Sequence, residues 1–116
     1  MFSLKNKVAL VTGAKQGMGR THALALAEMG AMVAVTNRAD NCQVVVDEII
    51  SKGGEAAGFV MDVTSSKEID SVFEEVIKKY GRLDILVNNA GIFQQKMALD
   101  ITEEDWENMI HIDLRG

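Results

Sequence analysis

Three glycines stand close together near the amino end of the chain, in the stretch VALVTGAKQGMGR. Gly13, Gly17 and Gly19 follow an apolar run at 8–11 and precede a helical pattern, so they lie between an expected strand and an expected helix. A helix N-terminus presents unpaired N–H groups and a partial positive charge, which attract a pyrophosphate. Gly13 would allow the tight turn, Gly17 the approach of the phosphates, and Gly19 close packing of the helix. The alternative is a flexible loop that holds no ligand.

The end of the second expected strand, about 20 residues further on, distinguishes two dinucleotides. An acidic residue there would bind a ribose 2′-OH and repel a 2′-phosphate, but this chain has Asn37 and Arg38. Asn37 carries no charge, and Arg38 offers a planar fork of donors to a phosphate. We therefore expect NADP(H) to be preferred, with NAD(H) as the alternative. Arg38 as a solvated surface residue, with Asp40 as the nearby acid, would be the contrary interpretation.

The remaining candidates for cofactor binding lie in the glycine loop and at two later strand ends. Within the loop they are Lys15, which adds positive charge, Gln16 and Met18. Asp62 and Val63 follow the third apolar run, where a carboxylate would accept a hydrogen bond from an adenine amino group; the alternative is a turn residue. The last candidates follow the fourth run, where open α/β sheets bind ligands, or else form a turn: Asn89, Ala90 and Gly91.

Strands and helices that would position these residues alternate along the chain. Continuous apolar runs at 8–11, 32–35, 57–61 and 83–87 predict strands buried on both faces, as in a parallel sheet under helices. Helical patterns lie between and after them, which predicts right-handed crossovers. The fold class is therefore α/β, a Rossmann-like doubly wound parallel sheet in one domain over residues 1–116.

The helical patterns carry their own start and stop signals. The first continues from Met18 to Gly30 with one apolar face, formed by His22, Ala25, Leu26 and Met29. Capping boxes predict the next two starts, at Asp40 with Gln43 and at Ser65 with Glu68. Gly53 and Gly81 predict their ends. The fourth helix is expected to begin at Thr102 and to include Trp106, Met109, Ile110 and Asp113.

Composition excludes several classes of function. The chain has 116 residues, 47% apolar and 25% charged, which suits one small globular domain. A net charge of −5 argues against a nucleic-acid partner. Cys42 is the only cysteine, and neither His22 nor His111 has metal-ligand spacing, so we expect no disulfide and no metal site. No apolar stretch is long enough for a signal peptide or a membrane span, which predicts a cytoplasmic protein without membrane partners.

Four segments together resemble the short-chain dehydrogenase/reductase family. TGAKQGMG resembles its TGxxxGxG cofactor loop, DVT its adenine-contacting segment, NNAG its fourth-strand motif, and ITEEDWENMIHIDLRG the helix that follows. They occur in family order across essentially the whole chain, which corresponds to the N-terminal, cofactor-binding half of that fold. The general character is similar to 3-oxoacyl-carrier-protein reductases and to sugar or polyol dehydrogenases.

The resemblance implies hydride transfer between NADP(H) and a small-molecule ketone or secondary alcohol. It also implies a catalytic serine and a Tyr-x-x-x-Lys pair, but Tyr80 is the only tyrosine and Asp84 stands four residues later. Asp113 occupies the position of the family's relay asparagine, which makes it the one catalytic candidate. Whether the chain is an enzyme therefore stays open, and we expect cofactor binding without turnover in this truncated fold.

Two other functions remain open at this stage: a stand-alone nucleotide-binding or regulatory module, and an interaction protein whose cofactor loop is a relic. The residues at 83–87 would form an unpaired apolar edge of a sheet truncated after its fourth strand-helix unit. Because exposed edges of this kind pair with other chains, we expect self-association or a homo-oligomer.

Overall fold

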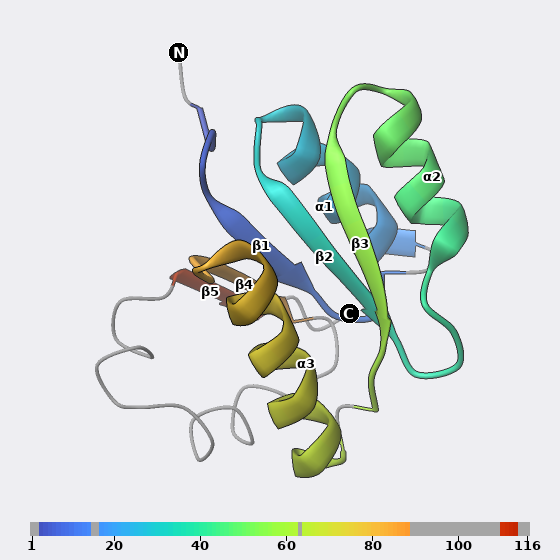
Figure 1. Ribbon diagram of the computed structural model, residues 1–116. Coiled ribbons are helices and arrows are strands. Elements are labelled where there is room, and N and C mark those ends of the chain that lie inside the picture. Colours follow the sequence, from blue (N-terminus) through green and yellow to red (C-terminus); the bar gives the residue numbers. More distant parts are fainter. Residues whose placement is uncertain (1–2, 15–16, 63, 89–109, 114–116) are drawn as a thin grey trace.

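The computed structural model shows a parallel sheet with helices on both faces (Figure 1). The structure describes residues 3–14, 17–62, 64–88 and 110–113. The strands in these residues are β1 (Val8–Val11), β2 (Met32–Asn37), β3 (Glu55–Val60), β4 (Ile85–Asn88) and β5 (Ile110–Asp113). Their order across the sheet is β3-β2-β1-β4-β5. This confirms the predicted Rossmann-like α/β class, because the chain moves outward from β1 in one direction and then returns to its other side.

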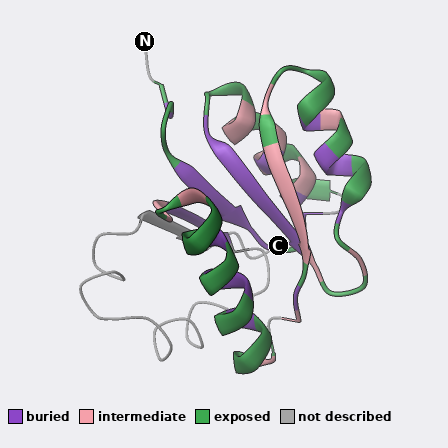
Figure 2. Cartoon of the chain, viewed as in Figure 1, coloured by how far each residue is buried: buried purple, intermediate pink, exposed green. Residues whose placement is uncertain are grey.

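Helices α1 (Gly17–Glu28) and α2 (Gln43–Ser51) cover one face of the sheet, and α3 (Ser66–Tyr80) covers the other (Figure 1). Strands β1 and β2 are buried on both sides, as expected, whereas the third apolar run forms the edge strand β3, whose residues are intermediate or exposed (Figure 2). Side chains alternate between the two layers: Val11 and Val35 pack with the first pair of helices, whereas Leu10 and Leu86 pack with α3. The sheet therefore separates two apolar cores.

The buried face of α1 differs from the predicted one. Gly19 and Ala23 are its buried residues, while Ala25 is exposed and Met29 is 38% exposed. The prediction selected the larger apolar side chains at helical spacing. The structure instead buries the small residues Gly19 and Ala23, while Leu24, Leu26 and Ala27 pack against the same core and are partly buried.

The start of α2 also differs from the prediction. The N-cap position is Cys42, in the left-handed region at φ 55°, and its side chain makes no capping hydrogen bond. The predicted cap, Asp40, instead accepts a hydrogen bond from the Cys42 N–H at 2.9 Å. The Gln43 side chain donates to Asp47 at 2.8 Å, along α2. The bond from Cys42 to Asp40 forms a local Asx turn, which is the competing use of an aspartate at such a position.

The start and end of α3 are confirmed. Ser65 Oγ accepts from the Glu68 N–H at 3.3 Å, and Gly81 ends the helix in the left-handed conformation at φ 81°. The Glu68 side chain accepts from the Asp62 N–H at 3.3 Å instead of from its own N-cap residue. The cap therefore also fixes the turn that follows β3.

The predicted fourth helix is wrong over residues 110–113, which form β5 and pair with β4. Isoleucines alternate there with His111 and Asp113, and this spacing satisfies a strand as well as one turn of helix. Residues 99–109 lie outside the described part. Because β4 has β1 on one side and β5 on the other, the predicted unpaired edge at 83–87 is also wrong. The expected self-association loses its structural basis with it.

Asp84 joins the amino ends of β1 and β4. Its Oδ2 accepts from the Val8 N–H at 2.9 Å, and its own N–H donates to the Val8 carbonyl at 2.8 Å. Arg82 donates to both carboxylate oxygens. Burial raises the pKa of Asp84, but the hydrogen bonds from Arg82 and Val8 and the charges of Arg82 and Lys7 outweigh it, so the pKa lies below its ordinary value.

Asp84→Asn should therefore change how stability depends on pH. A carboxyl with a lowered folded-state pKa contributes stability above its unfolded-state pKa of about 3.9, and loses it as pH falls through the folded-state pKa. We expect the wild type to exceed Asp84→Asn in free energy of unfolding at pH 7, and the difference to shrink below about pH 4. Urea denaturation across this range measures it, and a difference that stayed constant with pH would contradict the linkage.

Candidate functional site

The carboxyl ends of four parallel strands meet at one edge of the sheet. β1 ends at Val11 before the glycine loop, β2 at Asn37, β3 at Val60 before Asp62, and β4 at Asn88. β1 lies between β2 and β4, so the strand order reverses beside it. Open α/β sheets bind their ligands in the crevice at such a switch point. The sequence-predicted residues at these strand ends therefore share one edge of the molecule.

The glycine turn, which contains Gly13, Gly17 and Gly19, has the left-handed backbone conformations that favour glycine. Gly13 and Gly17 have φ values of 61° and 63°, which L side chains rarely adopt. A Cβ on Gly19 would lie 2.1 Å from the carbonyl oxygen of Gly13, so α1 packs against the turn with no room for a methyl group. A Cβ on Gly17 would meet nothing within 4 Å. The space next to Gly17 is open, as an approaching ligand needs.

Hydrogen bonds hold this turn to both neighbouring strands. The Thr12 N–H donates to Val87 of β4 at 3.0 Å, and the Ala14 N–H donates to Thr36 of β2 at 3.0 Å. Thr36 Oγ1 also donates to the Val11 carbonyl at 3.3 Å. The glycine turn is thereby fixed across the switch point on both sides.

Arg38 and Asp62 approach each other beyond the ends of β2 and β3. Arg38 Nε lies 3.7 Å from Asp62 Oδ2, and the Arg38 side chain is 83% exposed. Asp62 Oδ1 accepts from the backbone N–H and the hydroxyl of Thr64, at 2.9 and 2.7 Å. These contacts support the interpretation of Asp62 as a turn residue. They leave its contact with an adenine as a prediction.

Gly58 is a positioning residue that sequence reasoning missed. A Cβ there would lie 1.8 Å from the carbonyl oxygen of Asn41, so the segment between β2 and α2 rests directly on β3. The available signal was a glycine inside an apolar strand, which often marks a close backbone approach. This contact fixes the segment that begins with Arg38.

Several predicted residues lie outside the described part of the chain: Lys15, Gln16, Val63, Asn89, Ala90 and Gly91. Met18 lies in the first turn of α1, with its side chain 55% exposed. Asp113 ends β5 opposite Asn88, in a strand and not in the helix where the family places its relay asparagine. Its backbone nevertheless reaches the same edge of the sheet as the glycine turn. Its catalytic role stays a prediction.

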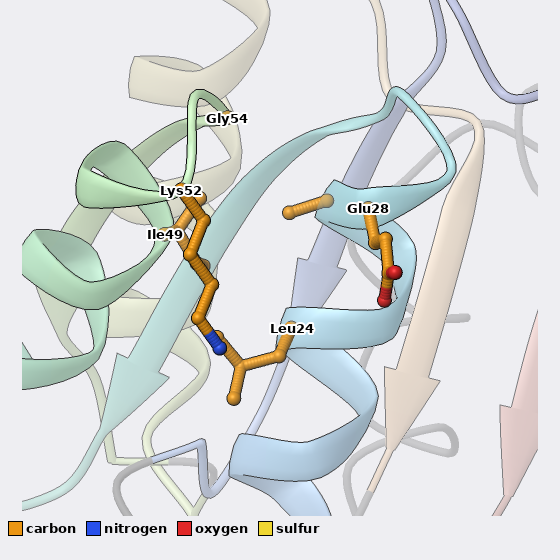
Figure 3. Close-up of a pocket in the computed structure, with 6 residues that line it drawn as sticks. Leu24, Glu28, Ile49, Lys52 and Gly54 are labelled. Carbon is orange, nitrogen blue, oxygen red and sulfur yellow. The ribbon is translucent and has the colours of Figure 1, made fainter.

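A hollow lies away from this edge, between the carboxyl-terminal halves of α1 and α2 (Figure 3). It has a volume of about 370 Å³, and its lining comes from Leu24, Ala27, Glu28, Ile49, Lys52 and Gly54. Among the described residues, no group of three or more His, Cys, Asp or Glu side chains is placed to hold a metal ion. The described helices also include none with the length and apolar character needed to cross a membrane.

Comparison with known proteins decides the family. The family model described as short chain dehydrogenase matches residues 7–116, nearly the whole chain. The chain belongs to the short-chain dehydrogenase family. A 3-oxoacyl-[acyl-carrier-protein] reductase from Staphylococcus epidermidis is 41% identical over 113 residues, which cover 96% of this chain and 46% of the relative. The chain thus spans about half the length of the curated short-chain dehydrogenases it matches.

Solved short-chain dehydrogenases have the same fold. A metagenomic short-chain oxidoreductase in complex with NADP superposes with a TM-score of 0.71 at 40% identity, over 75% of this chain and 40% of that one. A 7α-hydroxysteroid dehydrogenase complexed with NADH and 7-oxo glycochenodeoxycholic acid gives 0.74 at 41% identity, over 78% and 36%. Both relatives hold a nicotinamide dinucleotide, one with the 2′-phosphate and one without.

Gly19→Ala should destabilise this short-chain dehydrogenase chain, because the new methyl group would force α1 away from the Gly13 carbonyl. Overpacking of this kind costs about 1–3 kcal/mol in the free energy of unfolding. Gly17→Ala is the matched control: it has open space, and its cost comes from the positive φ alone, about 1–2 kcal/mol. Urea denaturation followed by circular dichroism compares the two. A loss at Gly19 no greater than the loss at Gly17 would contradict the close packing.

Proposed function

We propose that the chain forms the dinucleotide-binding part of a short-chain oxidoreductase that transfers hydride between NADP(H) and a carbonyl or secondary alcohol. The observation that carries this proposal is the glycine turn at the switch point. Gly13 and Gly17 take left-handed backbone conformations, and Gly19 lies against Gly13 where no Cβ fits. The N-terminus of α1 follows this turn, which suits a pyrophosphate.

The described residues fit a bound dinucleotide at this edge. Open space next to Gly17 would admit the phosphates, and Asn37 and Arg38 would reach the adenosine ribose at the end of β2. Asp62 lies at the neighbouring strand end, where it would face the adenine. When bound, the nicotinamide ring supplies the site that accepts or donates hydride. The chain's own residues hold the adenosine end and exclude other orientations.

Arg38 supports NADP(H) over NAD(H). Of the arginines in the described residues, Arg20 and Arg82 each donate to both oxygens of a carboxylate. Arg38 has only the looser 3.7 Å contact with Asp62 and is 83% exposed. Its guanidinium is therefore the one placed to turn toward a 2′-phosphate without breaking a bidentate pair. NAD(H) is the second candidate, because one solved relative is complexed with NADH.

Turnover requires groups that these residues do not supply. The family's Tyr-x-x-x-Lys pair has no counterpart, since Tyr80 is the only tyrosine and residue 84 is aspartate. We propose that this chain by itself binds the cofactor and does not reduce a ketone. A stand-alone nucleotide-binding or regulatory module would behave in the same way. The two differ in whether the natural reading frame continues into a Tyr-x-x-x-Lys segment.

Arg38→Asp tests the choice of cofactor. The variant should weaken NADPH binding by about 1.5–3 kcal/mol, the contribution of a hydrogen bond to a charged group, and change NADH binding far less. Calorimetric titration with each dinucleotide gives the two dissociation constants. Lys5→Asp, an exposed site before β1, makes the same change in net charge and should leave both constants unaltered.

Equal losses for the two dinucleotides would refute the 2′-phosphate assignment. An absence of binding by the wild type at millimolar NADPH and NADH would overturn the proposed function itself. In that case the interaction protein with a relic cofactor loop would be the better account.

A further inference from the structure

Arg20 stands one residue after the glycine turn and yet contacts α2. Arg20 Nε donates to Glu48 Oε1 at 3.0 Å, and Arg20 Nη2 donates to Glu48 Oε2. The pair is partly shielded, with the Arg20 side chain 42% and the Glu48 side chain 23% exposed. A bidentate fork of this kind fixes direction as well as distance. The cation nearest to the glycine turn in α1 is thereby held against the neighbouring helix.

Glu48 in turn belongs to the helix that follows the expected ribose-binding residues. Arg38 is separated from the start of α2 by four residues only, and this short segment is fixed at both ends. Asn37 accepts from the Met61 N–H at 2.9 Å, and the Asn41 carbonyl lies against Gly58. A shift of α2 along α1 would therefore pull on the four-residue segment that follows Arg38, against the contacts that fix its ends.

We propose that the Arg20–Glu48 pair is a positioning device for the dinucleotide: it sets the distance between the glycine turn and the Asn37–Arg38 end of β2. This inference rests on the proposed function, since it assigns the pyrophosphate of the dinucleotide to the glycine turn and its 2′-phosphate to the Asn37–Arg38 end of β2. Near the sheet, the Ala14–Thr36 hydrogen bond joins the same two units. The parallel pairing of β1 with β2 also joins them, and the Arg20–Glu48 pair adds a contact at the level of the helices, which limits the shift of α2 against α1.

The alternative role for Arg20 is direct contact with the pyrophosphate. In that role Glu48 would compete with the ligand for the guanidinium, and its removal would strengthen binding. As a positioning residue, Arg20 acts only through Glu48, and the removal of either partner has the same effect. The two roles therefore predict opposite results for Glu48→Gln.

The experiment compares Arg20→Gln, Glu48→Gln and the double variant in titrations with two ligands. NADPH spans both subsites, whereas adenosine 2′-phosphate carries the ribose phosphate without the pyrophosphate. We expect each variant to weaken NADPH roughly three- to tenfold, within the range for uncoupling two contacting residues, and the double variant to be no weaker than either single one. Adenosine 2′-phosphate should bind the wild type and all three variants equally, because it occupies only the Asn37–Arg38 end of β2 and does not span the distance to the glycine turn.

Two further variants sharpen the test. Lys52 is the other cation near Glu48, with its Nζ 3.9 Å from Glu48 Oε2. Lys52→Gln removes this charge and should leave NADPH binding unchanged. Arg20→Glu with Glu48→Arg restores the pair in reverse and should recover at least part of the affinity. Circular dichroism at the titration temperature confirms that each variant is folded.

Three results would overturn the inference. Tighter or unchanged NADPH binding by Glu48→Gln would make Arg20 a phosphate ligand or a bystander. Equal losses for NADPH and adenosine 2′-phosphate would indicate a general loss of structure. Failure of the wild type to bind NADPH would overturn the proposed function as well. If the wild type binds NADPH and the variants bind it equally well, only the positioning role is overturned.

Discussion

The close approach of α1 to the turn after β1 is the constraint on which the rest of the binding edge depends. With Gly13 in a left-handed conformation and Gly19 against its carbonyl oxygen, the helix begins directly above the end of the central strand. Its N-terminal dipole therefore points at the switch point. The burial of Gly19 follows from the same approach, since a Cβ there would lie 2.1 Å from the Gly13 carbonyl oxygen.

Charged side chains divide into structural and exposed groups. Asp84 accepts from Arg82 and from the Val8 N–H at the amino edge of the sheet, and Glu48 accepts from Arg20 between the two helices. The Val8–Asp84 and Arg20–Glu48 contacts each join segments far apart in the sequence, whereas Arg82 and Asp84 are two residues apart. Arg38 differs, because its contact with Asp62 is longer and its side chain is largely in solvent. The guanidinium groups of Arg20 and Arg82 are thus held in bidentate pairs, which the longer contact of Arg38 does not form.

Local patterns allowed much of this fold to be predicted. The four apolar runs, the glycine turn and the cap of α3 depend on neighbours within a few residues, and the structure contains all of them. The start of α2 was mispredicted because Asp40 has two local uses, a cap and an Asx turn, that look alike in sequence. Residues 110–113 were mispredicted because four residues satisfy both periodicities. The Arg20–Glu48 contact has no local pattern, since its partners are distant in the chain, and the glycine at 58 signals a close approach without indicating Asn41 as the partner.

The contact between Gly58 and Asn41 has a consequence for how cofactor preference can change. The segment from Arg38 to Asn41 leaves β2 at a paired strand end and returns to the sheet at a point where only glycine fits. Its two ends are therefore anchored by backbone contacts that are independent of the side chains between them. Substitutions in this segment can alter the charge beyond the end of β2 while the main chain keeps its course. The course of the main chain depends instead on Gly58, where a Cβ would lie 1.8 Å from the Asn41 carbonyl oxygen.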